Sequence, residues 1–324
     1  MTYIQAITNT LKEEMERDEK VFILGQDVGK KGGVFLATDG LYDEFGDERV
    51  IDAPLAESAI AGVGIGAAMY GMRPIAEIQF ADFILPAVNQ IISEAAKIRY
   101  RSNNDWDCPI TIRAPYGGGI NGALYHSQSV EAIFANQPGL KIVMPSTPYD
   151  AKGLLKAAIR DNDPVLFFEH KRAYRLLRDE VPEEDYVLPL GKADIKREGS
   201  DVTVITYGLC VHFALQAAER LAEEGIDAHI LDLRTVYPLD QEAIIKAANK
   251  TGKVLLITED NKEGSIISEV AAIIAENCLF ELDAPIQRLA GPDVPAMPYA
   301  PTLEDYFMIN PDQVEKAMRD LAEF

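Results

Sequence analysis

The stretch VIDAPLAESAIAGVGIGAAMYGMRPIAEIQF, residues 50–80, contains one complete strand–helix–strand unit. Residues 50–53 and 74–80 are short apolar runs with the composition of buried strands. Between them, residues 58–70 form a longer apolar segment of helical length. Because parallel strands need a crossover connection of this size, the stretch predicts a βαβ unit in a parallel sheet.

The same alternation continues on both sides of this stretch. Further strands are expected at residues 21–25, 110–113, 141–144 and 165–168, and helices at 3–16, 87–100, 127–135 and 148–159. The pattern predicts an α/β domain over residues 1–180, with a doubly wound, mostly parallel sheet. In such a sheet, functional loops follow the carboxyl ends of the strands.

An acidic segment with two prolines interrupts this alternation, and we expect a linker at residues 181–190. Beyond it, strands are predicted at residues 201–206, 228–233 and 254–259, and helices at 212–224, 241–249 and 312–323. The proline-rich stretch 284–301 is expected to wrap a surface. A second, smaller α/β domain over residues 191–324 is therefore predicted.

Composition excludes several classes of partner. The chain has 31 Lys and Arg against 52 Asp and Glu, a net charge of -21 that repels nucleic acid and anionic membranes.

Cys108, Cys210 and Cys278 lie far apart, so neither a disulfide framework nor a thiolate metal site is expected. Neither a secretory signal nor an apolar run long enough to span a membrane is visible. A cytoplasmic location is the prediction.

One motif favours another class of enzyme. Residues 62–67 (GVGIGA) match a dinucleotide-binding fingerprint, and Asp82 follows twenty residues after Gly62. The fingerprint requires its first glycine to follow a strand directly, whereas eight residues intervene here. We therefore expect these glycines inside a helix, with another element packed on that face. A nicotinamide-dependent dehydrogenase remains an alternative, which tight NADH binding by the isolated chain would support.

Two residues are candidates for chemistry. Glu57 lies between a predicted strand and helix among apolar neighbours, where burial would raise its proton affinity; a favourable helix dipole alone would also explain it. His126 follows the glycine-rich loop 117–122, close to where a ligand would lie; it could instead be only a hydrogen-bonded helix cap. The segment 161–164 fits a simple turn, or helix-end carbonyls that bind a cation.

Five motifs in order along the chain resemble the β subunits of 2-oxoacid dehydrogenases. They are LAES at 55–58, IQFADF at 78–83, RAPYGGG at 113–119, YHSQ at 125–128 and DLRT at 232–235. The sequences YHSQS at 125–129 and HKRAYR at 170–175 are more similar to the branched-chain enzymes than to the pyruvate enzymes. The resemblance covers nearly the whole chain.

The resemblance implies a pyrimidine-binding domain for thiamin diphosphate, followed by a transketolase-type C-terminal domain. It implies that Glu57 hydrogen-bonds a pyrimidine nitrogen of the cofactor and thereby activates it. Leu55, Gln79 and Phe83 match the cofactor-binding region, and Phe83 stands where some branched-chain members have tyrosine. His126 matches a histidine that serves acyl transfer to lipoamide.

The resemblance also implies metals and partners. Carbonyls of Ile110, Ala158, Asp161 and Asp163 match a potassium site, although Asp163 replaces an asparagine common in the family. The Gly-Asp-Gly motif that holds Mg²⁺ on the diphosphate is absent, so an α subunit must supply it. The resemblance therefore implies a two-alpha, two-beta heterotetramer docked on a lipoyl-bearing acyltransferase core.

The predicted function is the oxidative decarboxylation of 3-methyl-2-oxobutanoate and its branched homologues. A pyruvate dehydrogenase β subunit is the alternative within the family, and a substrate panel on the reconstituted complex separates the two. A noncatalytic assembly subunit with an acidic surface is a third possibility. Such a subunit would not need Glu57.

Overall fold

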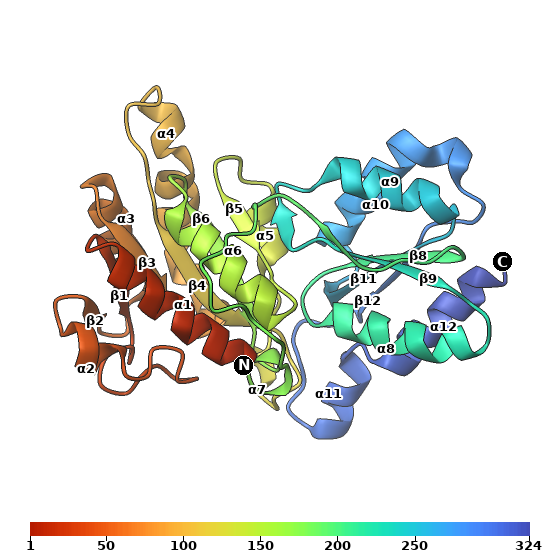
Figure 1. Ribbon diagram of the computed structural model, residues 1–324, viewed down its shortest axis with the longest axis horizontal. Helices are drawn as coiled ribbons and strands as arrows, with labels where there is room; N and C mark the ends of the chain where they lie inside the picture. The colour runs from red at the N-terminus through yellow and green to blue at the C-terminus, as the bar shows by residue number, and fades with distance from the viewer. The chain divides into compact units, whose positions relative to one another are not determined.

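A computed structural model describes all residues, Met1–Phe324, and its elements divide between two units (Figure 1). The first unit comprises Met1–Tyr116 and Ile133–Leu190. The second comprises Gly191–Phe324 together with Gly117–Ala132, a segment from the middle of the chain. No helix combines the length and the hydrophobicity that a membrane crossing requires.

A parallel sheet forms the centre of the first unit. Its strands lie in the order β5-β6-β4-β3-β1-β2, and every neighbouring pair is parallel. The bounds are β1 Val21–Gly25, β2 Val50–Asp52, β3 Arg73–Glu77, β4 Thr111–Tyr116, β5 Lys141–Val143 and β6 Val165–His170. Every residue of β1, β4 and β6 is buried, as expected when helices cover both faces of a parallel sheet.

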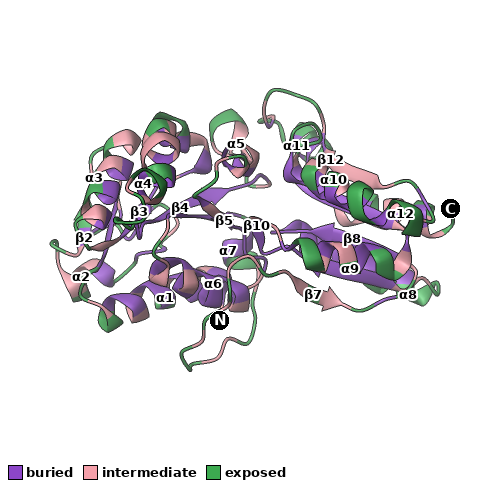
Figure 2. Cartoon of the chain, turned by 90° about the horizontal axis from the view of Figure 1, so that it is seen from above, coloured by how far each residue is buried: buried purple, intermediate pink, exposed green.

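Helices cover both faces of this sheet (Figure 2). On one face lie α1 (Tyr3–Arg17) and α6 (Pro148–Arg160), and on the other α3 (Glu57–Met69) and α4 (Ile98–Arg101). The shorter helices are α2 (Leu41–Phe45) and α7 (Ala173–Leu176). Thr2 and Gln5 begin α1 with a capping box, and its buried face packs against α6. The unit therefore has the doubly wound arrangement predicted from the alternation of strands and helices over residues 1–180.

The predicted helix at residues 87–100 is wrong as a continuous element. The chain instead forms the 3₁₀ helix η1 (Ala81–Ala87), the π turn η2 (Gln90–Glu94), the 3₁₀ turn η3 (Ala95–Lys97) and α4. Pro86 lies inside η1 and has no amide hydrogen to donate, which breaks the regular α-helical bonding. The predicted helix at 127–135 is also shorter, since α5 spans only Glu131–Ala135 after the 3₁₀ turn η4 (Ala123–Tyr125).

The expected linker at residues 181–190 packs on helix α6. Asp185 forms ion pairs with Lys156 and Arg160 of this helix, both at 2.8 Å or less. Leu188 donates its amide to the Gly153 carbonyl at 3.1 Å. A side chain at Gly153 would lie 2.6 Å from Leu188 Cγ, so glycine is required where the two segments touch. The segment is thus an ordered part of the first unit.

The second unit contains a smaller sheet in the order β12-β11-β8-β9-β7. All its pairs are parallel except β7–β9. The strands are β7 Asp194–Arg197, β8 Val202–Thr206, β9 Ala228–Asp232, β11 Val254–Asn261 and β12 Gln287–Gly291, and the short strand β10 is Thr235–Tyr237. Strands β7 and β12 were not predicted, because they are short and only partly buried.

Helices flank this sheet on both faces (Figure 1). On one side lie α9 (Gln241–Thr251) and α10 (Ile266–Cys278), and on the other α8 (Cys210–Glu223) and α12 (Pro311–Ala322). The last elements are the 3₁₀ turn η5 (Leu279–Glu281) and α11 (Pro301–Phe307). Helices α10 and α11 were missed by the sequence analysis. The predicted second α/β unit is present.

Candidate active site

Three loops of the first unit meet at one edge of its sheet. Gly25, Asp52 and Glu77 end strands β1, β2 and β3 in register, so the connections that follow them are neighbours. Gln79 Nε2 donates to Asp27 Oδ2 at 2.9 Å and so joins the loops after β3 and β1. This edge is where parallel α/β sheets bind ligands.

Glu57 is the first residue of α3 and lies half-buried at this edge. The preceding residue, Ala56, makes no side-chain cap, so the first amides of the helix are left for another acceptor. Leu55 is 71% exposed and offers apolar surface beside them. The turn after β2 therefore presents a carboxylate and an apolar side chain to a ligand or a partner chain.

Gln79 and Phe83 follow strand β3 on the neighbouring connection. Phe83 is half-buried in η1, which packs against α3, and its ring meets Phe80 edge-on at 5.5 Å. The side-chain hydrogen bonds of Asp27 with Lys31 and with Gln79 hold the pKa of Asp27 below its ordinary value. The structure thus groups Leu55, Glu57, Gln79 and Phe83 on adjacent connections of one unit.

A buried ionic network lies in the strands below these loops. Arg113 donates to Glu169 through Nε and Nη2, at 2.6 and 2.7 Å, and to Glu77 through Nη1 at 2.7 Å. Tyr174 donates its hydroxyl to Glu169 at 2.6 Å. Burial raises the pKa of Glu77, and Glu169 adds to this effect against the opposing charge of Arg113. Glu77 precedes Gln79 by two residues, so the network anchors the strand end from which Gln79 projects.

His126 lies in the segment of the chain that belongs to the second unit. It is half-buried and directly follows η4. A Cβ on Gly122 would lie 2.8 Å from the His126 Cβ, so the preceding loop runs immediately against this residue. His126 is the C-cap residue of η4, where its backbone amide donates to the Ala123 carbonyl at 3.4 Å, and it precedes α5, which begins at Glu131.

A buried acidic cluster that sequence reasoning missed follows His126 in the same unit. Glu131 is buried, and Tyr207 donates its hydroxyl to Glu131 Oε1 at 2.8 Å. Asp260, at the end of β11, has its pKa raised to about 6 by burial, and Glu259 adds to the effect. Because the members lie far apart in the sequence, no local pattern signals them.

The four predicted potassium ligands are adjacent in the first unit. The Ile110 carbonyl accepts from Val165 N at 2.9 Å, next to the turn that contains Asp161 and Asp163. The Ala158 carbonyl accepts from Asp161 N at 3.3 Å. A carbonyl oxygen has two lone pairs, so each of these can still approach a cation.

Positive side chains compete for this loop. Arg73 Nη1 donates to the Asp161 carbonyl at 2.9 Å, and Lys141 pairs with the Asp161 carboxylate at 2.6 Å. The Asp163 carboxylate pairs with Arg99 at 2.5 Å. No group of three or more His, Cys, Asp or Glu side chains is arranged to hold a metal ion. A cation in this loop would have to bind through backbone oxygens, because both carboxylates already pair with Lys141 and Arg99.

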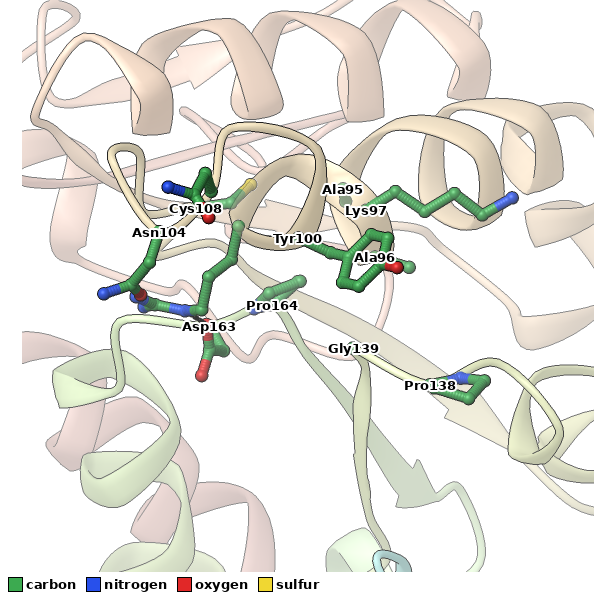
Figure 3. Close-up of a pocket in the computed structure, with 12 residues that line it drawn as sticks. Ala95, Ala96, Lys97, Tyr100, Asn104, Cys108, Pro138, Gly139, Asp163 and Pro164 are labelled. Carbon is green, nitrogen blue, oxygen red and sulfur yellow. Dashed lines mark hydrogen bonds and ion pairs between the residues drawn. The ribbon is translucent and has the colours of Figure 1, made fainter.

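Asp163 also borders the pocket shown in Figure 3, which has a volume of about 790 Å³. Tyr100 and Cys108 line the same pocket. Burial raises the pKa of the Cys108 thiol to about 12, so this cysteine is not a nucleophile near neutral pH. Asp163 is the sole predicted site residue in its lining.

Comparison with known proteins decides the family. Residues 1–176 match the family model for the pyrimidine binding domain of transketolase, and residues 191–314 match the transketolase C-terminal domain. Over 324 residues, covering 100% of this chain and 99% of the relative, the chain is 82% identical to the 2-oxoisovalerate dehydrogenase subunit beta of Bacillus subtilis. The chain belongs to the β subunits of 2-oxoacid dehydrogenases.

Within this family the chain is of the branched-chain type. It is 48% identical to the pyruvate dehydrogenase E1 component subunit beta of Bacillus subtilis, over the same share of both chains. This value is far below the 82% shared with the 2-oxoisovalerate enzyme. The prediction of family and subfamily from the motifs is confirmed.

Solved structures support the fold of the family. A split-gene transketolase described as an inactive β4 tetramer has a TM-score of 0.80 at 23% identity, covering 100% of this chain and 98% of that one. A transketolase from Pichia stipitis has a TM-score of 0.71 at 16% identity and is covered over 46% of its length. At these identities the likeness shows the fold alone.

The glycine motif has a structural explanation in this family member. Gly62, Gly64 and Gly66 all lie within α3, as expected, and not in a strand-to-helix turn. A Cβ on Gly64 would lie 2.8 Å from Ile110 Cδ1, so the residue directly before β4 packs against this side of the helix. Nothing lies within 4 Å of a Cβ on Gly66. The motif therefore serves helix packing at Gly64, and the geometry for dinucleotide binding is missing.

Proposed function

We propose that the chain, as the β subunit of a branched-chain 2-oxoacid dehydrogenase, supplies Glu57 and His126 for two successive steps of the reaction. The substrates are 3-methyl-2-oxobutanoate and its branched homologues, whose acyl group passes to lipoamide. The observation that carries the proposal is Glu57, a half-buried carboxylate at an uncapped helix start on the ligand-binding edge of the sheet.

The residues around Glu57 fit an aromatic nitrogen heterocycle. When bound, thiamin diphosphate supplies the nucleophilic carbon and the electron sink for decarboxylation. Glu57 would hold a proton between its carboxyl group and a pyrimidine nitrogen, which controls the basicity of the ring amino group. Phe83 would pack on the ring, with Leu55 and Gln79 beside it.

His126 would act in the second step. Acyl transfer to lipoamide opens a dithiolane ring, and the departing sulfur needs a proton. A protonated imidazole can donate it. Two observations support this role of His126. It follows a tightly held loop, and the sequence around it matches the family.

The proposal includes an α subunit that ligates Mg²⁺ on the diphosphate, in a two-alpha, two-beta heterotetramer. We also propose docking on a lipoyl-bearing acyltransferase core, a cytoplasmic location, and K⁺ held by carbonyls of Ile110, Ala158, Asp161 and Asp163. The absence of a Gly-Asp-Gly motif supports the need for the α subunit.

Reconstitution with a candidate α chain tests the proposal. The complex should decarboxylate 3-methyl-2-oxobutanoate with a higher kcat/KM than pyruvate, measured with an artificial electron acceptor. The isolated chain should show no micromolar binding of thiamin diphosphate with Mg²⁺ in calorimetry. A preference for pyruvate would assign the chain to the pyruvate enzyme, and normal activity of Glu57→Ala would support a noncatalytic subunit.

A further inference from the structure

The glycine loop, residues 117–122, is held by two carboxylates of the second unit. Gly118 N donates to Glu259 Oε1 at 2.5 Å. Gly119 N donates to Glu304 Oε1 at 3.0 Å, and Asn121 N donates to both oxygens of Glu304 at 3.1 Å. Three backbone amides within four residues therefore converge on two side chains.

Both carboxylates are buried. Glu304 in α11 is 4% exposed, and Glu259 in β11 is 7% exposed. Glu304 has no ion-pair partner, and the amides of the glycine loop are its hydrogen-bond donors. A buried carboxylate is costly unless donors surround it, and bonds from amides to a charged oxygen are stronger than neutral ones. Loop and carboxylate thus stabilise each other.

The rest of the loop is also confined. A Cβ on Gly118 would lie 2.4 Å from Met297 Cε and 2.8 Å from Met308 Sδ, so the backbone rests directly on these methionines. At the far end, Asn121 and Ala123 have φ of 56° and 55°. Asparagine tolerates this left-handed conformation, whereas alanine rarely adopts it unless its surroundings impose it.

We propose that Glu304, assisted by Glu259, is a positioning residue that holds the glycine loop in the conformation that presents His126. The inference rests on the function proposed for His126. Without the carboxylate, the Asn121 amide would lose its acceptor, Ala123 would relax from positive φ, and the turn η4 that begins at Ala123 would shift. His126 would then leave the place that acyl transfer requires.

The variant Glu304→Gln tests this in the reconstituted heterotetramer. The carboxamide keeps one acceptor oxygen but turns an NH₂ group toward the loop amides. Hydrogen exchange of peptides covering residues 117–126 should become faster. The kcat for acylation of a free lipoyl domain should fall on the order of 10²-fold, the effect of a misplacement of about 1 Å. The KM for that domain and decarboxylation to an artificial acceptor should stay unchanged.

The control is Asp305→Asn, which removes the same charge from the exposed neighbour in α11. It should leave exchange and both activities unchanged. Equal loss of both activities in Glu304→Gln, or unchanged exchange in the loop, would overturn the proposal. If Glu304→Gln does not assemble, Glu304→Asp is measured in the same way. This variant keeps the carboxylate but shortens the side chain by one methylene group.

His126→Ala in the same assays separates this inference from the function on which it rests. If His126→Ala leaves acylation intact, the role of His126 is wrong, whatever Glu304→Gln does. If His126→Ala abolishes acylation while Glu304→Gln loosens the loop without slowing transfer, Glu304 is not a positioning residue and the role of His126 stands.

Discussion

The Tyr207 hydroxyl donates to Glu131 Oε1 at 2.8 Å and lies 2.7 Å from Thr258 Oγ1. Glu131 is only 1% exposed, and its second oxygen, Oε2, is buried without a hydrogen-bond partner. Burial raises the pKa of Glu131 to about 8, and the charges of Asp260 and Glu259 add to the effect. Burial therefore favours the protonated form of this carboxyl group in the folded chain.

This raised pKa makes stability depend on pH. The folded chain keeps a proton that the unfolded chain releases above a pKa of 4.5, so the free energy of unfolding should decrease as pH rises from about 4.5 to about 8. Glu131→Gln keeps an acceptor for Tyr207 but cannot ionise. Its unfolding temperature, followed by circular dichroism, should fall less over this range than that of the unmodified chain. Parallel curves would show that Glu131 does not titrate as described.

Glu57→Gln should assemble normally but activate the cofactor poorly, because the amide cannot share a proton with the pyrimidine. Exchange of the thiazolium C2 proton should slow on the order of 10² to 10⁴-fold, the usual contribution of general acid–base catalysis. NMR after acid quench measures this rate in the reconstituted complex. Normal exchange, with calorimetry showing full cofactor occupancy, would exclude Glu57 from activation.

His126→Ala should separate the two half-reactions. Lipoyl-domain acylation should slow by about 10² to 10⁴-fold, while decarboxylation to an artificial electron acceptor is retained, since proton donation to sulfur is needed only in the transfer. Both rates are measured on one preparation. An equal loss of acylation and decarboxylation would mean that His126 orients cofactor or substrate. Unchanged rates of both would mean that His126 has a structural role.

Arg113→Met should destabilise the chain by about 3–5 kcal/mol, because it leaves Glu77 and Glu169 buried without their cation. Urea unfolding of the full chain measures the loss. Adding Glu77→Gln and Glu169→Gln to the same chain removes the uncompensated charges and should restore part of the stability. A loss below about 1 kcal/mol, typical of an exposed pair, would contradict this account of the network.

Potassium should stabilise the reconstituted complex if the carbonyls near Asp161 hold the ion. The unfolding temperature should be higher in KCl than in choline chloride at equal ionic strength, by mass action on the folded state. NaCl serves as the second control, because the smaller ion fits a carbonyl ring differently. Equal unfolding temperatures in all three salts would show that these carbonyls hold no stabilising potassium ion.

Much of the fold was predictable because its signals are local. The alternation in residues 50–80 predicted β2, α3 and β3 within a few residues, since buried strands and a crossover helix need apolar runs of characteristic length. The same stretch predicted that Glu57 lies in the turn between a strand and a helix expected to begin at Ser58, one residue later than the observed start of α3. The region around Pro86 was not predicted correctly. The sequence does not show which 3₁₀ and π turns replace the α-helical hydrogen bonds that are interrupted there.

Local signals in the sequence are enough to predict the family, the two α/β units and the position of Glu57 after a strand, since each follows from motifs or periods within a few tens of residues. The tertiary structure places residues 117–132 in the second unit, where Glu259 and Glu304 bind loop amides 141 to 185 positions away. It also selected Glu77 and Glu169 as partners of Arg113. The reason is that a buried charge takes whichever partner the fold brings within reach, and no local pattern encodes that choice.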